Sequence, residues 1–391
     1  MKQGWVKKKL GEIGKASMCK RIFKNETLVD GEIPFYKIGT FGKEPNAFIS
    51  KDLYNEYREK YRFPKKGDVL ISASGTIGRT VIYDGEPAYF QDSNIVWIDN
   101  NEKSVTNMFL FALYKSVNWG ESKGTTIKRL YNSNLEEIEI HYPESFEEQK
   151  RIVAKLDQCF EAIDKARANA AKNLENAKEL FQSKLNEIFS KKGEGWVEKK
   201  LGDVCNKITD GSHNPPKKKD QGLMMLSGRN VTESGLDFTK VRYISSKDFN
   251  SENKRTDIQS GDVLLTIVGT IGRSVVYPKS APKVVFQRSV AVIKPQDVIN
   301  SYFLSYAFDC SKYQKLLKDK SRGVAQKGIY LKTIRNLPIE MPSITEQESI
   351  VNQLNIFKEQ AQSLESKYQQ ELNSLEELKK SILQKAFEGE L

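Results

Sequence analysis

The chain has 391 residues, of which 38% are hydrophobic and 29% are charged. This length predicts two or three domains with sizeable cores, and the composition excludes a disordered chain. The net charge of +11 favours an anionic partner, and nucleic acid is the commonest partner of that kind.

Four scattered cysteines form no CxxC pair, so we expect neither a zinc site nor a disulfide framework. Such sparse cysteine suits a reducing compartment, and we expect a cytoplasmic protein. The first 13 residues lack an apolar run, and no stretch approaches 18 apolar residues. We therefore predict no signal peptide and no membrane partner.

In chain order, segments of the first half return in the second half at an offset that drifts from 191 to 199 and settles at 198. The matched segments are GWVKKKLGEI (4–13) and GWVEKKLGDV (195–204), KKGDVLISASGTIGR (65–79) and QSGDVLLTIVGTIGR (259–273), FQDSNIVWI (90–98) and FQRSVAVIK (286–294), and the stretches 138–157 and 337–355. Small insertions between matched blocks indicate two diverged copies of one whole domain.

Each copy is rich in β-branched and aromatic residues between turn residues. Residues 68–72 and 80–83 are predicted strands joined by a glycine turn at GTIG, and the second copy repeats this pattern. Helices are expected near 106–118 and 300–317. The fold class predicted is α+β, with two homologous globular domains that contain mixed or antiparallel sheets. The GTIG motif is then a structural turn.

A long amphipathic helix follows each copy, because apolar residues recur at steps of three and four over about five heptads without Pro or Gly. The predicted domains are 1–146 and 196–344, and the predicted helices are 147–195 and 345–391. Antiparallel pairing of the helices as a coiled coil would separate the two domains in a pseudo-twofold, nearly circular arrangement. The predicted seam between the helices contains Ile152, Leu156, Ile163, Leu174, Leu180, Ile350, Leu354, Leu364, Leu375 and Leu378.

The positive charge lies mainly in the second domain, where residues 196–344 hold 25 Lys and Arg against 14 Asp and Glu. Two kinds of loop in each domain mix basic and polar residues that contact phosphates and base edges, although surface loops also vary without function. The candidate DNA-binding residues are Lys20, Arg21, Lys37, Arg79, Lys123, Thr125, Lys128, Arg129, Lys217, Lys218, Lys219, Arg229, Asn230, Arg273, Arg288, Lys320, Arg322, Gln326 and Lys327.

Catalytic signatures are missing from the sequence. It has no GxxxxGK[ST] motif, and the two histidines, His141 and His213, cannot form HExxH. Asn214-Pro215-Pro216 is similar to the NPPY/F motif of amino-methyltransferases, but Lys217 stands at the aromatic position, so we interpret it as a turn. The sequence predicts a chain that is not catalytic alone, with no cofactor and no metal of its own.

The chain resembles the specificity subunit of type I restriction-modification systems over essentially all of its length. The resemblance rests on the duplicated GTIGR with the following Phe90-Gln91 and Phe286-Gln287, on DGSHNPP (210–216), and on the strand-to-helix junctions IHYPESFEEQKRIV and IEMPSITEQESIV. The first junction departs from the family pattern, because Tyr142-Pro143-Glu144 stands in place of a Pro-Pro run.

The resemblance implies that each globular domain is a target-recognition domain that reads one half of an interrupted site in double-stranded DNA. It implies that the helices set the spacing and dock two modification (methyltransferase) subunits that methylate adenine N6. Restriction (ATP-dependent translocase/nuclease) subunits join these, so S-adenosylmethionine, ATP and Mg²⁺ are expected on partner subunits. The alternatives are a stand-alone DNA-binding protein, a coiled-coil adaptor that binds proteins, and a fused methyltransferase-nuclease. The absence of a glycine-rich loop for S-adenosylmethionine opposes the last alternative.

Overall fold

The fold is described from a computed structural model that covers residues 3–117, 119, 121–122, 125–126, 129–191, 193–323 and 327–391. The chain forms two compact units. Unit 1 comprises Met1–Ala171 with Gln370–Leu391, and unit 2 comprises Lys172–Gln369. The domain boundaries predicted from the sequence separate helices from globular domains, whereas these units divide each long helix in two.

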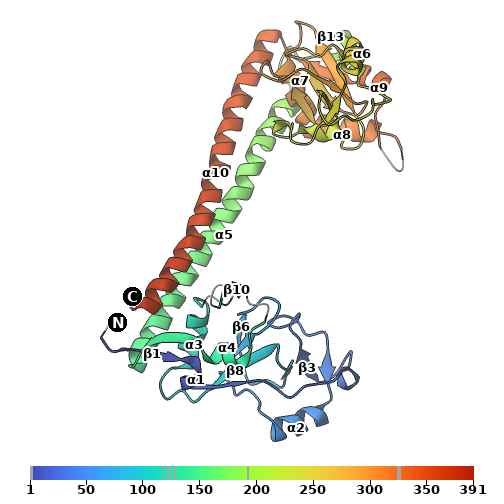
Figure 1. Ribbon diagram of the computed structural model, residues 1–391. Helices are drawn as coiled ribbons and strands as arrows, with labels where there is room; N and C mark the ends of the chain where they lie inside the picture. Colours follow the sequence, from blue (N-terminus) through green and yellow to red (C-terminus); the bar gives the residue numbers. More distant parts are fainter. Residues whose placement is uncertain are drawn as a thin grey trace. The chain divides into compact units, whose positions relative to one another are not determined.

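Unit 1 begins with a globular part made of short strands and helices (Figure 1). Its elements are β1 (Trp5–Lys9), α1 (Leu10–Ile13), β2 (Gly14–Ser17), η1 (Lys24–Glu26), β3 (Ile33–Tyr36), β4 (Phe48–Ile49), α2 (Lys51–Lys60), β5 (Val69–Ser72), β6 (Thr80–Ile82), β7 (Tyr89–Phe90), β8 (Ile95–Asn100), α3 (Asn107–Tyr114), β9 (Glu121–Ser122), β10 (Thr125–Thr126), α4 (Asn132–Glu136) and β11 (Glu139–Pro143). The first long helix, α5 (Phe146–Ser190), follows.

The globular part of unit 2 repeats this order with insertions. Its elements are β12 (Val197–Lys200), η2 (Leu201–Asp203), β13 (Cys205–Asp210), β14 (Leu223–Leu226), η3 (Gly228–Asn230), β15 (Val231–Thr232), β16 (Gly235–Leu236), β17 (Arg242–Ile244), α6 (Ser246–Thr256), β18 (Val263–Thr266), β19 (Ser274–Val276), β20 (Val284–Phe286), β21 (Val290–Pro295), α7 (Ser301–Asp309), α8 (Ser311–Lys320), α9 (Leu331–Arg335) and β22 (Pro338–Met341). The second long helix, α10 (Ile344–Glu388), follows.

The main sheets of the two units correspond strand by strand. Each has a four-stranded antiparallel sheet, in the order β2-β8-β5-β6 in unit 1 and β13-β21-β18-β19 in unit 2. Each also has a three-stranded mixed sheet, β4-β3-β7 or β17-β14-β20, in which one neighbouring pair is parallel. A two-stranded pair, β1-β11 or β12-β22, joins the first strand to the last. The predicted α+β class and the duplication are confirmed.

Two predicted helices need correction. The single helix predicted near 300–317 is two helices, because Cys310 between α7 and α8 has an extended backbone. The side chain of Gln314 stabilises this break, since its Nε2 donates hydrogen bonds to the carbonyls of Phe308 and Gly272. Near 106–118 the helix is shorter than predicted, because α3 ends at Tyr114.

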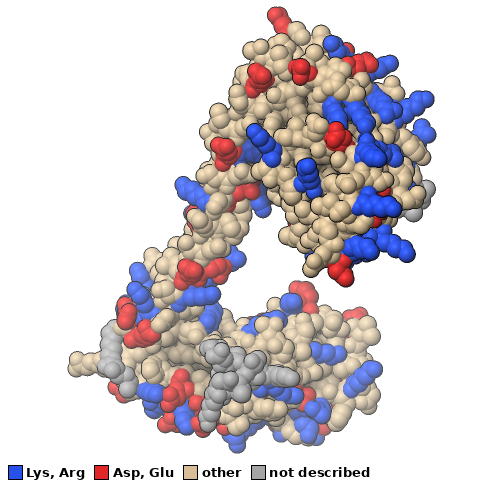
Figure 2. Space-filling model, turned by 45° about the horizontal axis from the view of Figure 1, so that its top comes forward, with Lys and Arg blue, Asp and Glu red and all other residues tan. Residues whose placement is uncertain are grey.

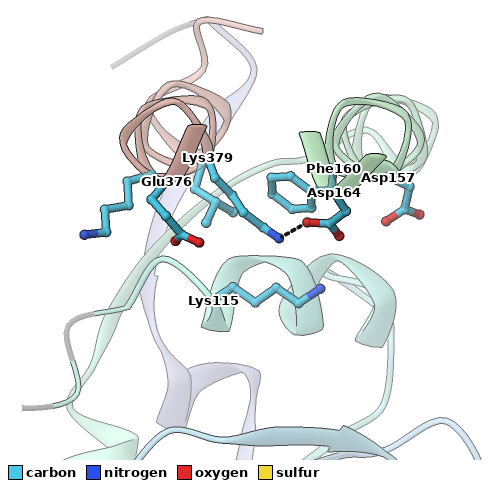
Figure 3. A pocket seen from close by; sticks show the side chains of 8 residues that line it. Lys115, Asp157, Phe160, Asp164, Glu376 and Lys379 are labelled. Atoms are coloured by element: carbon cyan, nitrogen blue, oxygen red, sulfur yellow. Dashed lines mark hydrogen bonds and ion pairs between the residues drawn. The ribbon is translucent and has the colours of Figure 1, made fainter. Parts of the chain in front are cut away.

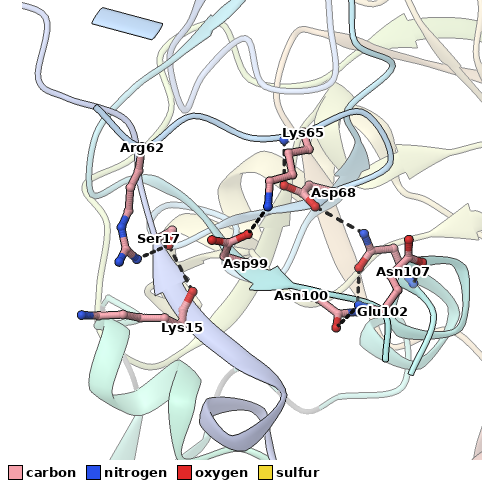
Figure 4. Close-up of polar contacts among 9 residues, drawn as sticks. All are labelled: Lys15, Ser17, Arg62, Lys65, Asp68, Asp99, Asn100, Glu102 and Asn107. Atoms are coloured by element: carbon pink, nitrogen blue, oxygen red, sulfur yellow. Dashed lines mark hydrogen bonds and ion pairs between the residues drawn. The ribbon is translucent and has the colours of Figure 1, made fainter. Parts of the chain in front are cut away.

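A buried aspartate repeats before the central strand of each unit. In unit 1, Asp68 accepts hydrogen bonds from the backbone N–H of Lys65 at 2.8 Å and from Asn107 Nδ2 at 3.3 Å (Figure 4). In unit 2, Asp262 accepts from the N–H of Gln259 at 2.9 Å and pairs with Lys294 at 2.7 Å. Burial is the main cause that raises the pKa of both carboxyls. The Gly-Asp-Val repeat is therefore a structural turn.

A buried glutamine near the start of each long helix joins three segments of its unit. Gln149 Nε2 donates to the carbonyls of Ser104 and Pro143, and its Oε1 accepts from the N–H of Thr106. In unit 2, Gln347, 198 positions later, makes the corresponding contacts, with Val298, Pro342 and Asn300. Both side chains are fully buried. This explains the EEQ and TEQ of the two strand-to-helix junctions.

Within each unit, part of α5 lies beside part of α10 and both pack on the globular core (Figure 1). The predicted seam residues Ile152, Leu156, Ile163, Ile350 and Leu354 are buried, and Leu174, Leu364 and Leu375 are half-buried. Leu180 and Leu378, also predicted for the seam, are 39% and 46% exposed, which corrects that prediction. These two positions are equivalent. A straight helix of 3.6 residues per turn drifts away from a strict heptad, so Phe181 and Leu185 face the core instead of Leu180.

No helix within the described ranges is both long enough and apolar enough to span a membrane.

Candidate nucleic-acid interface

The GTIG turns are held by the same hydrogen bonds in both units. The hydroxyl of Ser72 in unit 1 and of Thr266 in unit 2 accepts from the N–H of the arginine that ends the motif, at 2.8 and 2.9 Å. The glycines have φ values between 64° and 95°, a region that other residues rarely adopt. The predicted structural role of the turn is confirmed.

In unit 1 the loop that follows Phe90-Gln91 lies beside this turn. The N–H of Ala73 donates to the carbonyl of Asn94 at 2.7 Å. Two predicted DNA-binding residues converge on the same loop. Arg21 pairs with Asp92 at 2.9 Å, and Arg129 donates to the carbonyl of Ser93 at 2.9 Å. The structure thus brings together candidates that are 108 positions apart in the sequence.

The other candidates of unit 1 differ in their surroundings. Lys20 is exposed, with its Nζ 4.9 Å from the ring centroid of Tyr61, and Lys37 is half-buried. Arg79 donates to the carbonyl of Phe41 at 2.9 Å, so its guanidinium supports the loop between β3 and β4. Three further candidates are not covered by the structure: Lys123 and Lys128 lie outside the described residues, as does the side chain of Thr125.

In unit 2 the corresponding turn borders a hollow of about 700 Å³. Gly269 and Thr270 of the turn form part of its wall, together with Gln287. Three cationic side chains line it: Arg229, Lys240 and Arg242. A hollow of this size with several converging cations and polar groups suits a phosphate or the edge of a base.

The lysine run of unit 2 adjoins this hollow. Arg242 donates to the carbonyl of Pro216 at 2.8 Å, and the N–H of Lys219 donates to the carbonyl of Tyr243 at 2.9 Å. Lys217, Lys218 and Lys219 are all exposed. The loop and strand β17 therefore present their basic side chains in one region of the surface.

The prediction that Asn230 binds DNA needs correction. It is 4% exposed, and its Nδ2 donates to the carbonyls of Asp237 and Lys240. Its Oδ1 accepts from the N–H of Ser227. Because these contacts occupy the buried amide, the side chain orders the loop that carries Arg229 and has no group left to offer DNA.

A second hollow, of about 560 Å³, lies on another side of the same turn. Gly269 and Ile271 line it, and so do the cationic residues Lys315, Lys318 and Lys327. Further predicted residues are exposed in unit 2, namely Arg288, Lys320 and Arg322. Gln326 lies outside the described residues. Figure 2 shows Lys and Arg side chains crowded on one side of unit 2.

Arg273 does not line either of these two basic hollows. It lines a hollow of about 600 Å³ next to parts of α5 and α10, with Asp309 and Lys358. Burial raises the pKa of Asp309 to about 7, although its hydrogen bond to Ser274 opposes that rise. This position argues for a structural role of Arg273 in unit 2.

Sequence reasoning missed five residues that line the two basic hollows: Lys240, Arg242, Gln287, Lys315 and Lys318. Gln287 belongs to the repeated Phe-Gln pair, which is a signal that the sequence did offer. The lysines of α8 also offered a signal in the sequence, because positions 315 and 318 share a helix face. Lys240 and Arg242 carry no signal of this kind, since only the fold of β17 brings them to the turn.

No group of three or more His, Cys, Asp or Glu side chains that could hold a metal ion occurs in the described part of the chain.

The fold and these surfaces define a duplicated α+β protein with two unlike basic surfaces. Residues 2–173 and 193–374 match the type I restriction modification DNA specificity domain. The chain therefore belongs to the family of type I restriction-modification DNA specificity subunits.

Individual relatives agree with this assignment. The chain is 60% identical over 154 residues to a putative type I restriction enzyme specificity subunit of Haemophilus influenzae, a match that covers 39% of this chain and 40% of that relative. It is 27% identical to the EcoBI specificity subunit of Escherichia coli, over 83% of this chain and 73% of that one.

Among solved structures, the HsdS subunit from Thermoanaerobacter tengcongensis has a TM-score of 0.64 at 21% identity and is covered over 98% of its length. A chain from a study of complex assembly and conformational transition of the type I R-M system has a TM-score of 0.72, also at 21% identity, and is covered over 99%. Both likenesses, which cover 100% of this chain, support the fold.

Proposed function

We propose that this chain is the DNA-reading subunit of a type I restriction-modification complex, in which each globular domain reads one half of an interrupted site. One observation carries the proposal. Both units present different basic residues around the same GTIG turn, with Arg21 and Arg129 in unit 1 and Arg229 and Arg242 in unit 2. A shared frame with unlike side chains suits two different half-sites.

In each domain, different residues contact phosphates and base edges. Exposed lysines such as Lys217–Lys219 neutralise phosphates and supply affinity that depends on salt. Residues that line the hollows beside the turns read base edges and supply sequence choice. Because the domains belong to one chain, binding of the first half-site makes the second contact intramolecular, which raises the overall affinity.

The long helices set the distance between the half-sites and dock two modification subunits. Leu180 and Leu378, which are equivalent and exposed, are candidate contacts for these partners. S-adenosylmethionine, ATP and Mg²⁺ belong on the modification and restriction subunits, which methylate adenine N6 and cleave DNA. The complex would act in the cytoplasm.

Exchange of one domain tests the proposal. Residues 196–344 are replaced by the matching domain of another family member, and the N6-methyladenine motif of the cell is sequenced. We expect one half of the motif to change while the other half and the gap stay the same. A parallel exchange of residues 1–146 should change the opposite half.

A methylome with and without the gene provides the control. An interrupted motif that disappears with the gene establishes the specificity role. If an exchange of one domain changes both halves, or if no motif depends on the gene, the proposal is wrong.

A further inference from the structure

Charged contacts accompany the apolar seam between α5 and α10 in unit 1. Arg167 pairs with Glu376 at 2.8 Å, and Asp164 pairs with Lys379 at 3.0 Å. The Nζ of Lys379 also lies 5.0 Å from the ring centroid of Phe160. Figure 3 shows Lys379 reaching across from α10 to Asp164, with the Phe160 ring beside it.

The duplication gives two of these contacts a counterpart in unit 2. Both long helices have 45 residues and begin 198 positions apart, so Arg167 corresponds to Glu365, and Glu376 to Lys178. Lys178 and Glu365 line the same hollow of unit 2. The Phe160–Lys379 contact corresponds to Lys358 and Phe181, which are 5.9 Å apart.

The same charge signs and residue types recur at the corresponding positions, but the two helices have exchanged them. At these positions α5 carries two cations, Arg167 and Lys178, and two phenylalanines, Phe160 and Phe181. The other helix, α10, carries both carboxylates, Glu365 and Glu376, and both lysines that face the phenylalanines. Each helix is therefore matched to the other helix and differs from its own duplicate.

Pairing of like helices would give a different result. An antiparallel α5–α5 pair from two copies of the chain would place Arg167 opposite Lys178. An α10–α10 pair would place Glu365 opposite Glu376, and Lys358 opposite Lys379. Like charges at such positions are unfavourable, and they replace pairs that attract.

We propose that these charges make the helix pairing selective, so that α5 accepts α10 and rejects a second α5, which prevents two copies of the chain from exchanging helices into α5–α5 and α10–α10 pairs. The duplication makes this necessary. Two diverged copies of one helix retain similar apolar stripes, and these alone discriminate poorly between a helix and its duplicate. The inference does not depend on what the globular domains bind.

The full-length chain with two substitutions provides the test. Lys178→Glu with Glu376→Arg leaves the net charge unchanged. It places like charges at both of these α5–α10 positions and opposite charges at the corresponding positions of α5–α5 and α10–α10 pairs. Two copies with different affinity tags are co-expressed, and the fraction of one tag that purifies with the other measures exchange between chains. We expect that fraction to rise about tenfold over the unsubstituted chain, since several modest charge terms change sign together.

Two further variants separate charge selection from general damage. In Arg167→Glu with Lys178→Glu, Glu365→Lys and Glu376→Lys, every charge is reversed but the pattern is kept, so exchange should stay at the unsubstituted level. In Lys178→Glu with Glu365→Lys, the α5–α10 pairs remain attractive while the like-helix repulsion is removed. This variant keeps the fold and should show an intermediate rise even if the first variant does not fold.

The proposal is overturned if the pattern-breaking variants exchange no more than the unsubstituted chain, which would mean that packing alone selects the partner helix. It is also overturned if the fourfold reversal exchanges as much as the pattern-breaking variants.

Discussion

Units 1 and 2 share their sheet orders, the hydrogen bonds of the GTIG turns and the contacts of a buried glutamine. They differ where side chains reach the surface. At the end of the helix that follows the central sheet, the exposed Lys115 of unit 1 corresponds to the half-buried Asp309 of unit 2, so the charge changes its sign. The polar contacts that fix the backbone have been kept, and the charges at the surface and beside the neighbouring helix have diverged.

The shared glutamines offer the strongest test of this comparison. Gln347→Leu leaves two carbonyls and one N–H without their partner in unit 2, so we expect a loss of about 3–5 kcal/mol in the free energy of unfolding. Hydrogen exchange resolved by segment should localise the loss to unit 2, and Gln149→Leu should affect unit 1. The exposed Gln353→Leu is the control and should change stability by less than about 0.5 kcal/mol. A loss spread equally over both units contradicts the prediction.

Substitution of the second glycine of each turn should destabilise the two units to different extents. A Cβ at Gly78 would lie 2.0 Å from the Trp119 ring, whereas at Gly272 the nearest atom is the Gln314 amide at 2.7 Å. The amide can move and the packed ring cannot, so Gly78→Ala should cost about 2–4 kcal/mol and Gly272→Ala about 1–2. Gly75→Ala controls for backbone strain alone. Equal losses in thermal unfolding at Gly78 and Gly272 would show that sterics do not distinguish the units.

The lysine run of unit 2 has no equivalent in unit 1. Replacement of Lys217, Lys218 and Lys219 by Ala should weaken binding of the assembled complex by about tenfold, alike for all DNA sequences, because phosphate contacts carry no sequence information. The slope of log K against log salt should fall by about 2–3. Alanine at the exposed Lys199 and Lys200 on β12 serves as the control. An unchanged salt slope removes this loop from the interface.

The smallest expected effect concerns Asp309. Its pKa is about 7 in the folded chain and about 3.9 when unfolded, so the folded state binds the proton more tightly. Stability of unit 2 should therefore fall as the pH rises from about 4 to about 7. Asp309→Asn lacks this loss and should be more stable than the unsubstituted chain by about 1–2 kcal/mol at pH 8. Parallel stability curves for the two proteins between pH 4 and 8 would refute this.

Sequence reasoning was right where a local pattern determines the structure. The repeat, the strands on either side of GTIG and the two helices follow from turn residues and apolar periodicity, and all were predicted. It was wrong where a tertiary contact decides the outcome. Asn230 looked like a polar loop residue but is buried under its own loop, and Leu180 fits a heptad but lies outside the contact. The hollow of unit 2 was also missed in part, because Arg242 reaches the turn only through the pairing of β17 with β14.

The buried glutamines help to fix the angle at which each long helix leaves its globular domain. A helix of 45 residues is about 67 Å long at 1.5 Å per residue. A change of about 10° in its angle at the root would move the far end by about 12 Å, which corresponds to about three base pairs at 3.4 Å each. Gln149 and Gln347 each tie a helix root to the adjoining strand end and to the loop before the neighbouring helix. The spacing role proposed above for the helices would therefore depend on these two helix roots, where each glutamine makes three hydrogen bonds.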